Sequence, residues 1–277
     1  MTKRIVLCAD DYGQAEAVSS GILALLAAER LSAVSCLVNQ PRWQLQAARL
    51  APFKDKADLG LHLNFTDGEA LSPVYRKQLG DKFMSLPQLL WRSMTRVPKL
   101  HSAALVAEIH AQLDAFHEAM GFLPRFIDGH QHVHHLPVIR EALLEVYAER
   151  LKGEGAYVRA VTQNWQPAQL LKGDIKSAVI HFTGGLDFAK RLDSVSIPHN
   201  TTFAGIYAFS QADHYRQYFQ QFLQASDDGG LIMCHPGLTA EDATDPISHA
   251  RLCEYDYFNS DAFLTDCESF DVSLTKL

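Results

Sequence analysis

Short runs of apolar and β-branched residues alternate along this chain with longer segments whose apolar residues recur at helical spacing. In the clearest pair, residues 4–9 predict a buried strand, and residues 15–30 predict a helix with one apolar face. Such alternation is typical of β-α units around a parallel sheet. Further strands are expected at residues 33–38, 58–63, 126–128, 157–161, 178–182, 203–209 and 231–234.

Between these strands the apolar spacing predicts further helices and one long loop. The helices are expected at residues 44–50, 86–95, 102–120, 137–151 and 211–224, the loop at residues 64–85, and a turn at residues 10–13. About eight strands alternating with helices predict an α/β fold, namely a distorted TIM-like (β/α) barrel, with an open doubly wound sheet as the alternative. The pattern is weakest over residues 163–202. Because no repeat or linker divides the chain, we expect a single domain over residues 1–277.

The composition argues against several classes of partner. The 25 Lys and Arg and the 32 Asp and Glu give a formal charge of −7, and no basic run supplies a footprint for nucleic acid. No apolar run approaches the roughly 18 residues that cross a bilayer, so we expect no membrane span. The five cysteines contain no C-x-x-C pair, and the apolar residues 5–9 are too few for a signal peptide. We therefore expect a cytoplasmic protein, and a symmetric homodimer is the default expectation for its size.

Histidine is unusually frequent, with 13 in the chain and four of them in residues 130–135. Histidine is the commonest metal ligand and exchanges protons near neutral pH. Several imidazoles that lie close together are costly to bury without a metal ion or specific partners. If this segment is extended, His130, His132 and His134 point the same way, and we expect one or two of them to bind metal. Asp128 is a candidate to orient a ligating imidazole, with a turn or surface role as an equal alternative.

Other polar residues also stand where predicted strands end. Asp10 and Asp11 follow the first strand, His62 lies at the end of the third, and His235 follows the last. Because the carboxyl ends of parallel strands converge on one face, where active sites are built, these residues can meet through the fold. Each has a structural alternative, either a turn or helix N-cap for the aspartates or a satisfied core position for the histidines. Two adjacent carboxylates repel each other, however, and a bound cation offsets that repulsion.

Around these residues the sequence resembles the YdjC-like carbohydrate deacetylase family, whose best-known members are chitooligosaccharide deacetylases. Each matching segment alone is a weak signal, but four in the family's order are specific. Cys8, Tyr12, Gly129 and Gln131 depart from the family's usual motifs without touching the positions of its metal ligands. The matching segments are Ala9-Asp10-Asp11-Tyr12-Gly13, Gly60-Leu61-His62-Leu63, Asp128-Gly129-His130-Gln131-His132-Val133-His134 and Cys234-His235-Pro236-Gly237.

The resemblance implies a distorted TIM-like barrel and one divalent metal ion held by Asp11, His62 and His130. It gives Asp10 the role of general base and His235 that of general acid. The expected reaction removes the acetyl group of an N-acetylated sugar by attack of a metal-bound water on the amide. The family is generally credited with Mg²⁺, which is the first expectation, whereas one carboxylate with two imidazoles also suits Zn²⁺ or another transition metal.

The expected partner is a small carbohydrate, in the first place a short chitooligosaccharide such as diacetylchitobiose. A lipid-linked N-acetyl sugar of the hopanoid glycolipid type is the alternative, and a metal phosphoesterase or a non-catalytic metal-binding protein ranks lower. Candidate substrate-binding residues are His132, Tyr12 and Arg159. For Tyr12 the alternative is a core position, and for Arg159 it is a surface ion pair.

Overall fold

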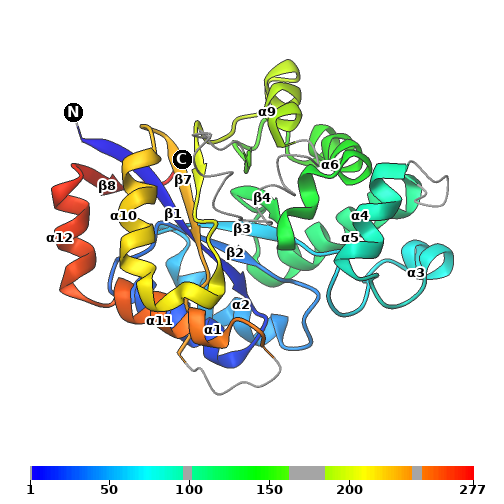
Figure 1. Ribbon diagram of the computed structural model, residues 1–277. Helices are drawn as coiled ribbons and strands as arrows, with labels where there is room; N and C mark the ends of the chain where they lie inside the picture. The colour runs from blue at the N-terminus through cyan, green and yellow to red at the C-terminus, as the bar shows by residue number, and fades with distance from the viewer. Residues whose placement is uncertain (1, 96–101, 162–184, 239–244) are drawn as a thin grey trace.

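The computed structural model describes residues 2–95, 102–161, 185–238 and 245–277, and its strands form one parallel sheet surrounded by helices (Figure 1). The sheet runs in the order β5-β4-β3-β2-β1-β7-β6, and β8 also pairs with β1. The strands are β1 (Lys3–Tyr12), β2 (Ala33–Cys36), β3 (Asp58–Leu63), β4 (Phe126–Gly129), β5 (Tyr157–Val158), β6 (Phe203–Ala204), β7 (Gly230–Cys234) and β8 (Val272–Leu274).

Helices follow most of the strands. The α-helices are α1 (Glu16–Ala27), α2 (Trp43–Leu50), α3 (Pro73–Leu79), α4 (Leu86–Thr95), α5 (Ser102–Met120), α6 (Pro137–Arg150), α9 (Gly185–Ser194), α10 (Tyr215–Ala225), α11 (Ser248–Phe258) and α12 (Asp261–Ser269). Short 3₁₀ helices are η1 (Ala51–Phe53), η2 (His130–His135) and η3 (Phe209–His214).

The sheet curls so that its two ends approach each other, which confirms the predicted distorted (β/α) barrel. Along β1, Leu7 packs in the large core beneath the helices, whereas Cys8 joins a smaller apolar cluster on the opposite face. This smaller cluster includes residues of β5 and β6, the strands at the two ends of the sheet order. Arg159, directly after β5, has its guanidinium carbon 5.9 Å from the ring centre of Phe203 in β6. The concave face is therefore the interior of a barrel that the described strands leave open.

The carboxyl end of β1 differs from its prediction. The strand continues through Asp10 and Asp11 to Tyr12, and the turn predicted at residues 10–13 lies one residue later, where the backbone N–H of Gln14 donates to the backbone oxygen of Asp11 at 3.0 Å. Its pairing with β2 shifts register between Ala9 and Tyr12, and Asp11 has a φ of 67°, in the left-handed region. Such an irregularity is typical of a β-bulge, which re-aims side chains at the end of a strand. Periodicity alone gives no sign of it.

Two further segments differ from their predictions. Residues 130–135 are not extended: they form η2, which is kinked where Gln131 and His132 adopt left-handed backbone angles. Helix α3 lies inside the predicted loop at residues 64–85, where the Ser72 hydroxyl accepts hydrogen bonds from the first turn. By contrast, β3, α4 and α5 have the predicted bounds.

The second half of the chain differs more from its predicted elements. Strand β6 ends at Ala204 rather than at residue 209. The 3₁₀ helix η3 occupies residues 209–214, so α10 begins at Tyr215 rather than at residue 211. The sequence patterns predicted no element after residue 237, yet α11, α12 and β8 follow it. The strand predicted at residues 178–182 lies outside the described residues.

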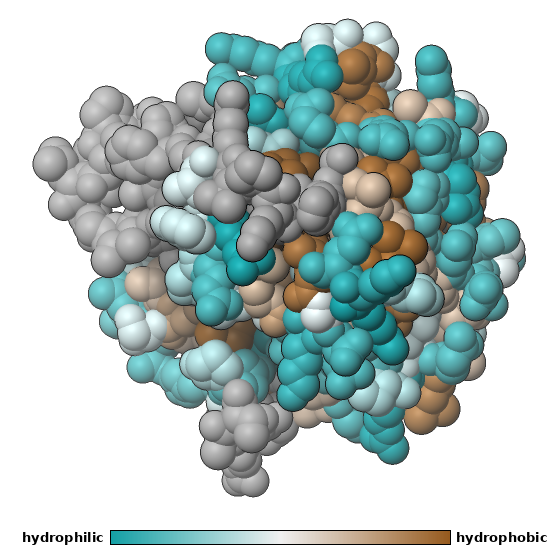
Figure 2. Space-filling model, turned by 90° about the vertical axis from the view of Figure 1, so that its right-hand side faces the viewer, coloured by the Kyte–Doolittle hydropathy of each residue, from teal (hydrophilic) through white to brown (hydrophobic). Residues whose placement is uncertain are grey.

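The side of the molecule that carries α3, α4 and α5 is largely hydrophilic, with separate hydrophobic patches among polar groups (Figure 2). Among its apolar side chains, Trp91 on α4 is 60% exposed and Val74 on α3 is 42% exposed. Within the described residues, no helix has the length and apolar character that crossing a bilayer requires.

Gly60 allows β3 to pack closely against β4. A methyl group at this position would overlap the ring of Phe126, and that ring also stacks on Tyr157 at a centroid distance of 5.0 Å. We expect Gly60→Ala to lower the free energy of unfolding by about 1–3 kcal/mol through overpacking. Denaturant unfolding measures this loss. In the Phe126→Leu background the same substitution should cost less, and strict additivity of the two changes would contradict the proposed clash.

Candidate active site

The residues predicted to carry chemistry gather at the carboxyl ends of the strands. A pocket of about 800 Å³ opens there, and side chains from separate strands and from η2 line it. Tyr12 and Arg159, two of the predicted substrate-binding residues, do not line this pocket. The predicted residues that do line it are Asp10, Asp11, His62, His130, His132 and His235.

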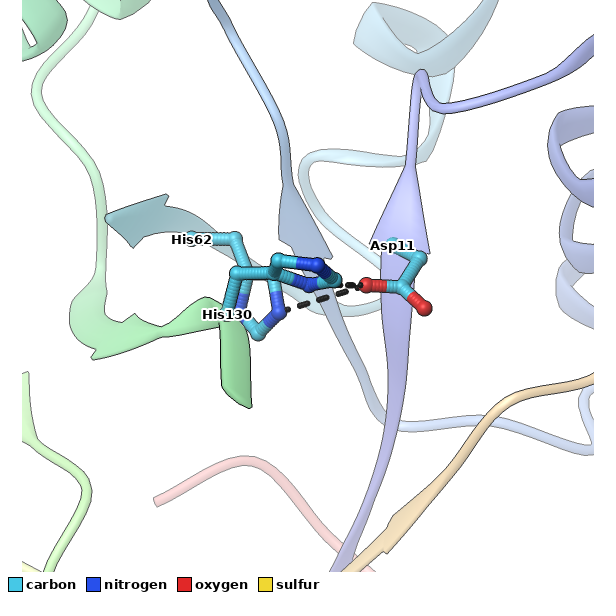
Figure 3. Close-up of side chains that lie close together, drawn as sticks. All are labelled: Asp11, His62 and His130. Atoms are coloured by element: carbon cyan, nitrogen blue, oxygen red, sulfur yellow. Dashed lines mark hydrogen bonds and ion pairs between the residues drawn. The ribbon is translucent and has the colours of Figure 1, made fainter. Parts of the chain in front are cut away.

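Asp11, His62 and His130 point toward one another from β1, β3 and η2 (Figure 3). The Asp11 Oδ1 atom lies 2.9 Å from Nδ1 of His130 and 3.4 Å from Nε2 of His62. One ligand atom from each residue lies within 4.8 Å of the other two. Asp11 and His62 are 51 residues apart in the sequence, and His62 and His130 are 68 apart. The fold brings them together because three strands end at the same edge of the sheet.

The imidazole of His62 is fixed by contacts at the nitrogen that faces away from Asp11. Its Nδ1 atom lies 2.7 Å from Oδ1 of Asp128 and 2.9 Å from the hydroxyl of Ser35, which leaves Nε2 facing Asp11. Although burial opposes a charge on this ring, Asp128 and Asp10 raise the pKa of His62 to about 10. A carboxylate behind an imidazole fixes its tautomer and increases its basicity, as in many metal sites. Asp128 thus has the orienting position that its sequence neighbourhood suggested.

Asp11 divides its two oxygens between different partners. Oδ1 faces the imidazoles, whereas Oδ2 accepts a hydrogen bond of 2.8 Å from Arg251 on α11. Burial acts against ionisation of Asp11, but Arg251 and His130 outweigh it and hold the pKa of this carboxyl well below its usual range. Asp245 binds Arg251 in turn at 2.6 Å. Sequence reasoning missed Arg251 because it lies beyond the last recognised segment, in a helix that no pattern predicted.

Arg159 lies on the concave face beneath the pocket, and its side chain is fully buried. It donates hydrogen bonds of 2.7 and 2.6 Å to the two oxygens of Asp10 and forms an ion pair with Asp128. The alternative of a surface ion pair is therefore wrong, and the side chain presents no exposed surface to the pocket. Instead, Arg159 supplies the cation that two buried carboxylates require.

His235 follows β7 and lines the same pocket as Asp11, His62 and His130. Its backbone N–H donates to Glu254, which also accepts a hydrogen bond of 2.7 Å from the hydroxyl of Tyr207. Burial lowers the pKa of His235 to about 4 and raises the pKa of Glu254 to about 7. The ring of Phe209 stands edge-on to the His235 ring, 5.4 Å away. Like Arg251, Glu254 belongs to α11 and gave no signal in the sequence.

The remaining predicted substrate contacts have different surroundings. The His132 ring lies edge-on to Phe203, and its Nδ1 atom has no hydrogen-bond partner among the described residues. Tyr12 is fully buried and donates its hydroxyl to the backbone oxygen of Gln46 at 2.8 Å, so it has the core position that was its alternative. In an extended segment His134 would point the same way as His130 and His132. Instead, its Nε2 atom contacts the backbone oxygen of Arg159.

The donor set fits a divalent metal ion. Two imidazoles and one carboxylate are common ligands of catalytic metals, and three protein ligands leave positions for water and substrate. His62 meets a further requirement, since Asp128 binds the nitrogen that faces away from the cluster. A second buried group, formed by Cys8, Asp10 and Asp128, already surrounds the guanidinium of Arg159. The first cluster is therefore the better candidate for the metal.

Comparison with known proteins assigns the chain to a family. Residues 4–269 match the YdjC-like protein family, which is nearly the whole sequence. The chain belongs to the YdjC-like family.

Two curated relatives of this YdjC-like protein illustrate the similarity. A carbohydrate deacetylase of Homo sapiens is 33% identical over 155 residues, which cover 55% of this chain and 46% of that protein. A chitooligosaccharide deacetylase of Yersinia enterocolitica is 24% identical over 281 residues, which cover 99% of this chain and 98% of that protein. The matched region thus spans about half the length of the vertebrate carbohydrate deacetylases.

Solved structures agree on the fold. The crystal structure of an Enterococcus faecalis protein assigned to cellobiose-phosphate cleavage superposes with a TM-score of 0.74 at 16% identity, covering 100% of this chain and 98% of that one. A peptidoglycan N-acetylglucosamine deacetylase superposes with a TM-score of 0.50 at 12% identity, covering 99% and 86%. At these identities the superpositions concern the fold alone.

We expect Arg159→Leu to lower the free energy of unfolding of this YdjC-like protein by about 3–5 kcal/mol, because Asp10 and Asp128 would lose their shared buried cation. Chemical denaturation at neutral pH measures the loss. Arg159 lowers the pKa of Asp128 against the effect of burial, so this contribution is present above the ordinary aspartate pKa of about 4 and is lost as pH falls below it. The difference in the free energy of unfolding between Arg159→Leu and wild type should therefore become smaller at acidic pH.

Arg4→Leu is the matched control. Arg4 also binds an aspartate with two hydrogen bonds, of 3.1 and 2.8 Å to Asp228, but this pair is exposed. Exposed ion pairs contribute little to stability, so we expect little change. Equal losses in the two variants would contradict the role given to burial.

Proposed function

We propose that this protein is a metal-dependent carbohydrate N-deacetylase. The observation that carries the proposal is the convergence of Asp11, His62 and His130 in one pocket that Asp10 and His235 also line. Relatives that are named carbohydrate or chitooligosaccharide deacetylases support the same activity. In this proposal the five residues are the ligands, the base and the acid of one amide hydrolysis.

The metal would be held by Oδ1 of Asp11, Nε2 of His62 and the imidazole of His130. When bound, a divalent ion polarises the substrate carbonyl and lowers the pKa of water. Two nitrogen donors and one carboxylate favour Zn²⁺ or another first-row transition metal, although the resemblance implied Mg²⁺. Metal analysis of the purified protein, followed by activity after chelation and reloading with each ion, separates these possibilities.

Asp10 is the proposed general base. Both of its oxygens accept hydrogen bonds from Arg159, which fixes the carboxylate at the pocket wall and leaves further lone pairs for a water proton. Asp11 is less suited to this role because its Oδ1 atom faces both imidazoles of the proposed ligand cluster. We therefore propose that the first aspartate moves the proton and the second binds the metal.

His235 is the proposed general acid. It lines the same pocket as the ligand cluster, and its backbone N–H donates a hydrogen bond to Glu254. Burial lowers the pKa of this ring, whereas the nearby Asp11 and Asp10 act to raise it, so in this proposal the ring acquires the proton within the site before passing it to the departing amine. Protonation of the amine completes the cleavage of the amide bond.

The pocket suits a neutral sugar. Arg251 is the one arginine among the described lining residues, and its Nη2 and Nε atoms already bind Asp11 and Asp245, which leaves only Nη1 without a partner. The described lining therefore lacks the bidentate arginine that phosphate recognition favours. Buried polar atoms without partners, including Nε2 of Gln40 and Oγ1 of Thr66, are available for sugar hydroxyls. This argues against the phosphoesterase alternative. We propose a short chitooligosaccharide as substrate, with a lipid-linked N-acetyl sugar as the second candidate.

Purified protein should release acetate from diacetylchitobiose in the presence of its metal and lose this activity on chelation. The measurement is an acetate assay alongside mass spectrometry of the sugar product. Parallel assays with an N-acetylated glycolipid decide between the two substrates. If no N-acetyl sugar or glycolipid yields acetate with any divalent ion, the proposed activity is wrong.

Asp10→Asn should reduce kcat by about 10²–10⁴-fold while metal binding is retained, because the variant lacks the base but keeps the ligands. Asp55→Asn is the matched control, since Asp55 is an exposed aspartate that does not line the pocket, and it should leave kcat nearly unchanged. Thermal unfolding of both variants checks that the fold persists. Loss of the metal in Asp10→Asn, with turnover retained on excess metal, would instead make Asp10 a ligand.

A further inference from the structure

A second group of metal-type donors lies on the surface, where η3 meets α11. Asp213 belongs to η3, and His249 and Cys253 are one helical turn apart on α11. Nε2 of His249 lies 2.8 Å from Oδ1 of Asp213 and 3.6 Å from Sγ of Cys253, and the Asp213 and Cys253 atoms are 3.9 Å apart. These three atoms form a compact triangle that no role in the pocket explains.

The arrangement differs from that of a nucleophilic triad. In a triad the cysteine contacts one nitrogen of the histidine and the aspartate contacts the other, so that a proton can pass through the ring. Here Asp213 and Cys253 both face the same nitrogen of His249. Convergence of three donors on one point is instead what a shared cation requires.

The size of the triangle fits zinc. Zinc lies about 2.3 Å from a thiolate sulfur and about 2.0–2.2 Å from imidazole nitrogen or carboxylate oxygen. Tetrahedral angles at such an ion place pairs of ligand atoms roughly 3.3–3.6 Å apart. The observed separations of 2.8, 3.6 and 3.9 Å bracket this range, so small side-chain movements suffice. The side chains of His249 and Asp213 are 63% and 75% exposed, which gives an ion access from solvent.

We propose that Asp213, His249 and Cys253 bind a zinc ion that joins η3 to α11. As the zinc–sulfur bond forms, the thiol proton of Cys253 passes to solvent, and water fills the fourth position. Burial and the neighbouring Asp213 raise the pKa of this thiol, so binding should strengthen as pH rises.

The proposed zinc site lies behind the pocket wall. The same α11 turns Arg251 and Glu254 inward to Asp11 and His235, and η3 contributes Phe209 to the pocket. A zinc ion bridging these two elements would therefore stabilise the wall that carries the proposed acid. The site is independent of the ligand cluster in the pocket, because the two share no residue.

Titration of the full-length protein with Co²⁺, read by near-ultraviolet absorption, tests the site through its thiolate-to-cobalt charge transfer. Wild type should show this band and should bind one more ion than Cys253→Ser, which should lack the band. Cys267→Ser is the matched control, since Cys267 is partly exposed but belongs to no donor cluster in the described chain, and it should keep the band. A band that persists in Cys253→Ser, or no band in wild type, overturns the proposal.

Zinc titration with calorimetry supplies the second readout. His249→Ala should weaken the zinc binding that wild type shows, and Cys253→Ser should lose it. With zinc at about a hundred times its dissociation constant, occupancy of this site should raise the unfolding midpoint of wild type by roughly 5 °C relative to Cys253→Ser. Binding seen only at millimolar zinc means an adventitious ion and overturns the proposal. Because neither readout uses acetate release, failure of this site and failure of the deacetylase proposal are distinguishable.

Discussion

The buried ion network of Arg159 with Asp10 and Asp128 is the constraint on which the rest of the site depends. A buried charge is tolerated only when partners compensate it closely, and here one guanidinium serves two carboxylates from different strands. The same Asp128 holds Nδ1 of His62, so the cation is connected through a carboxylate to the proposed ligand. The network therefore fixes the orientation of the proposed base and of one proposed ligand at the same time.

Alternation along parallel strands explains why the core and the site occupy one concave face. On the inner side, apolar Cys8 precedes Asp10, Phe126 precedes Asp128, and Met233 precedes His235 by two residues. The lower half of the barrel interior is thus apolar, and the polar groups follow at the carboxyl ends, where the strands converge. Gly60 belongs to this lower layer, because a methyl group there would meet Phe126, and His62 follows it on β3 by two residues.

The sequence was informative where chemistry coincided with strand periodicity. His62 points away from the helix-facing Leu61 and Leu63, as the alternation predicted, because β3 is regular throughout. The route of η2 was not predictable, since left-handed angles at Gln131 and His132 depend on local packing. Arg251 and Glu254 were equally inaccessible, because α11 mixes buried charges with apolar residues and so lacks the apolar face that identifies a helix.

The β-bulge at the end of β1 explains how two adjacent aspartates can take different roles. Neighbouring residues of a regular strand point to opposite faces, yet Asp10 and Asp11 both reach the pocket because the register shifts between them and β2. Their partners then separate them electrostatically: Asp10 is bound through both oxygens to one guanidinium, whereas Asp11 keeps one oxygen among the imidazoles. A symmetric pair would repel, so the neighbouring cations Arg159 and Arg251 are what make the proposed division into a base and a ligand electrostatically possible.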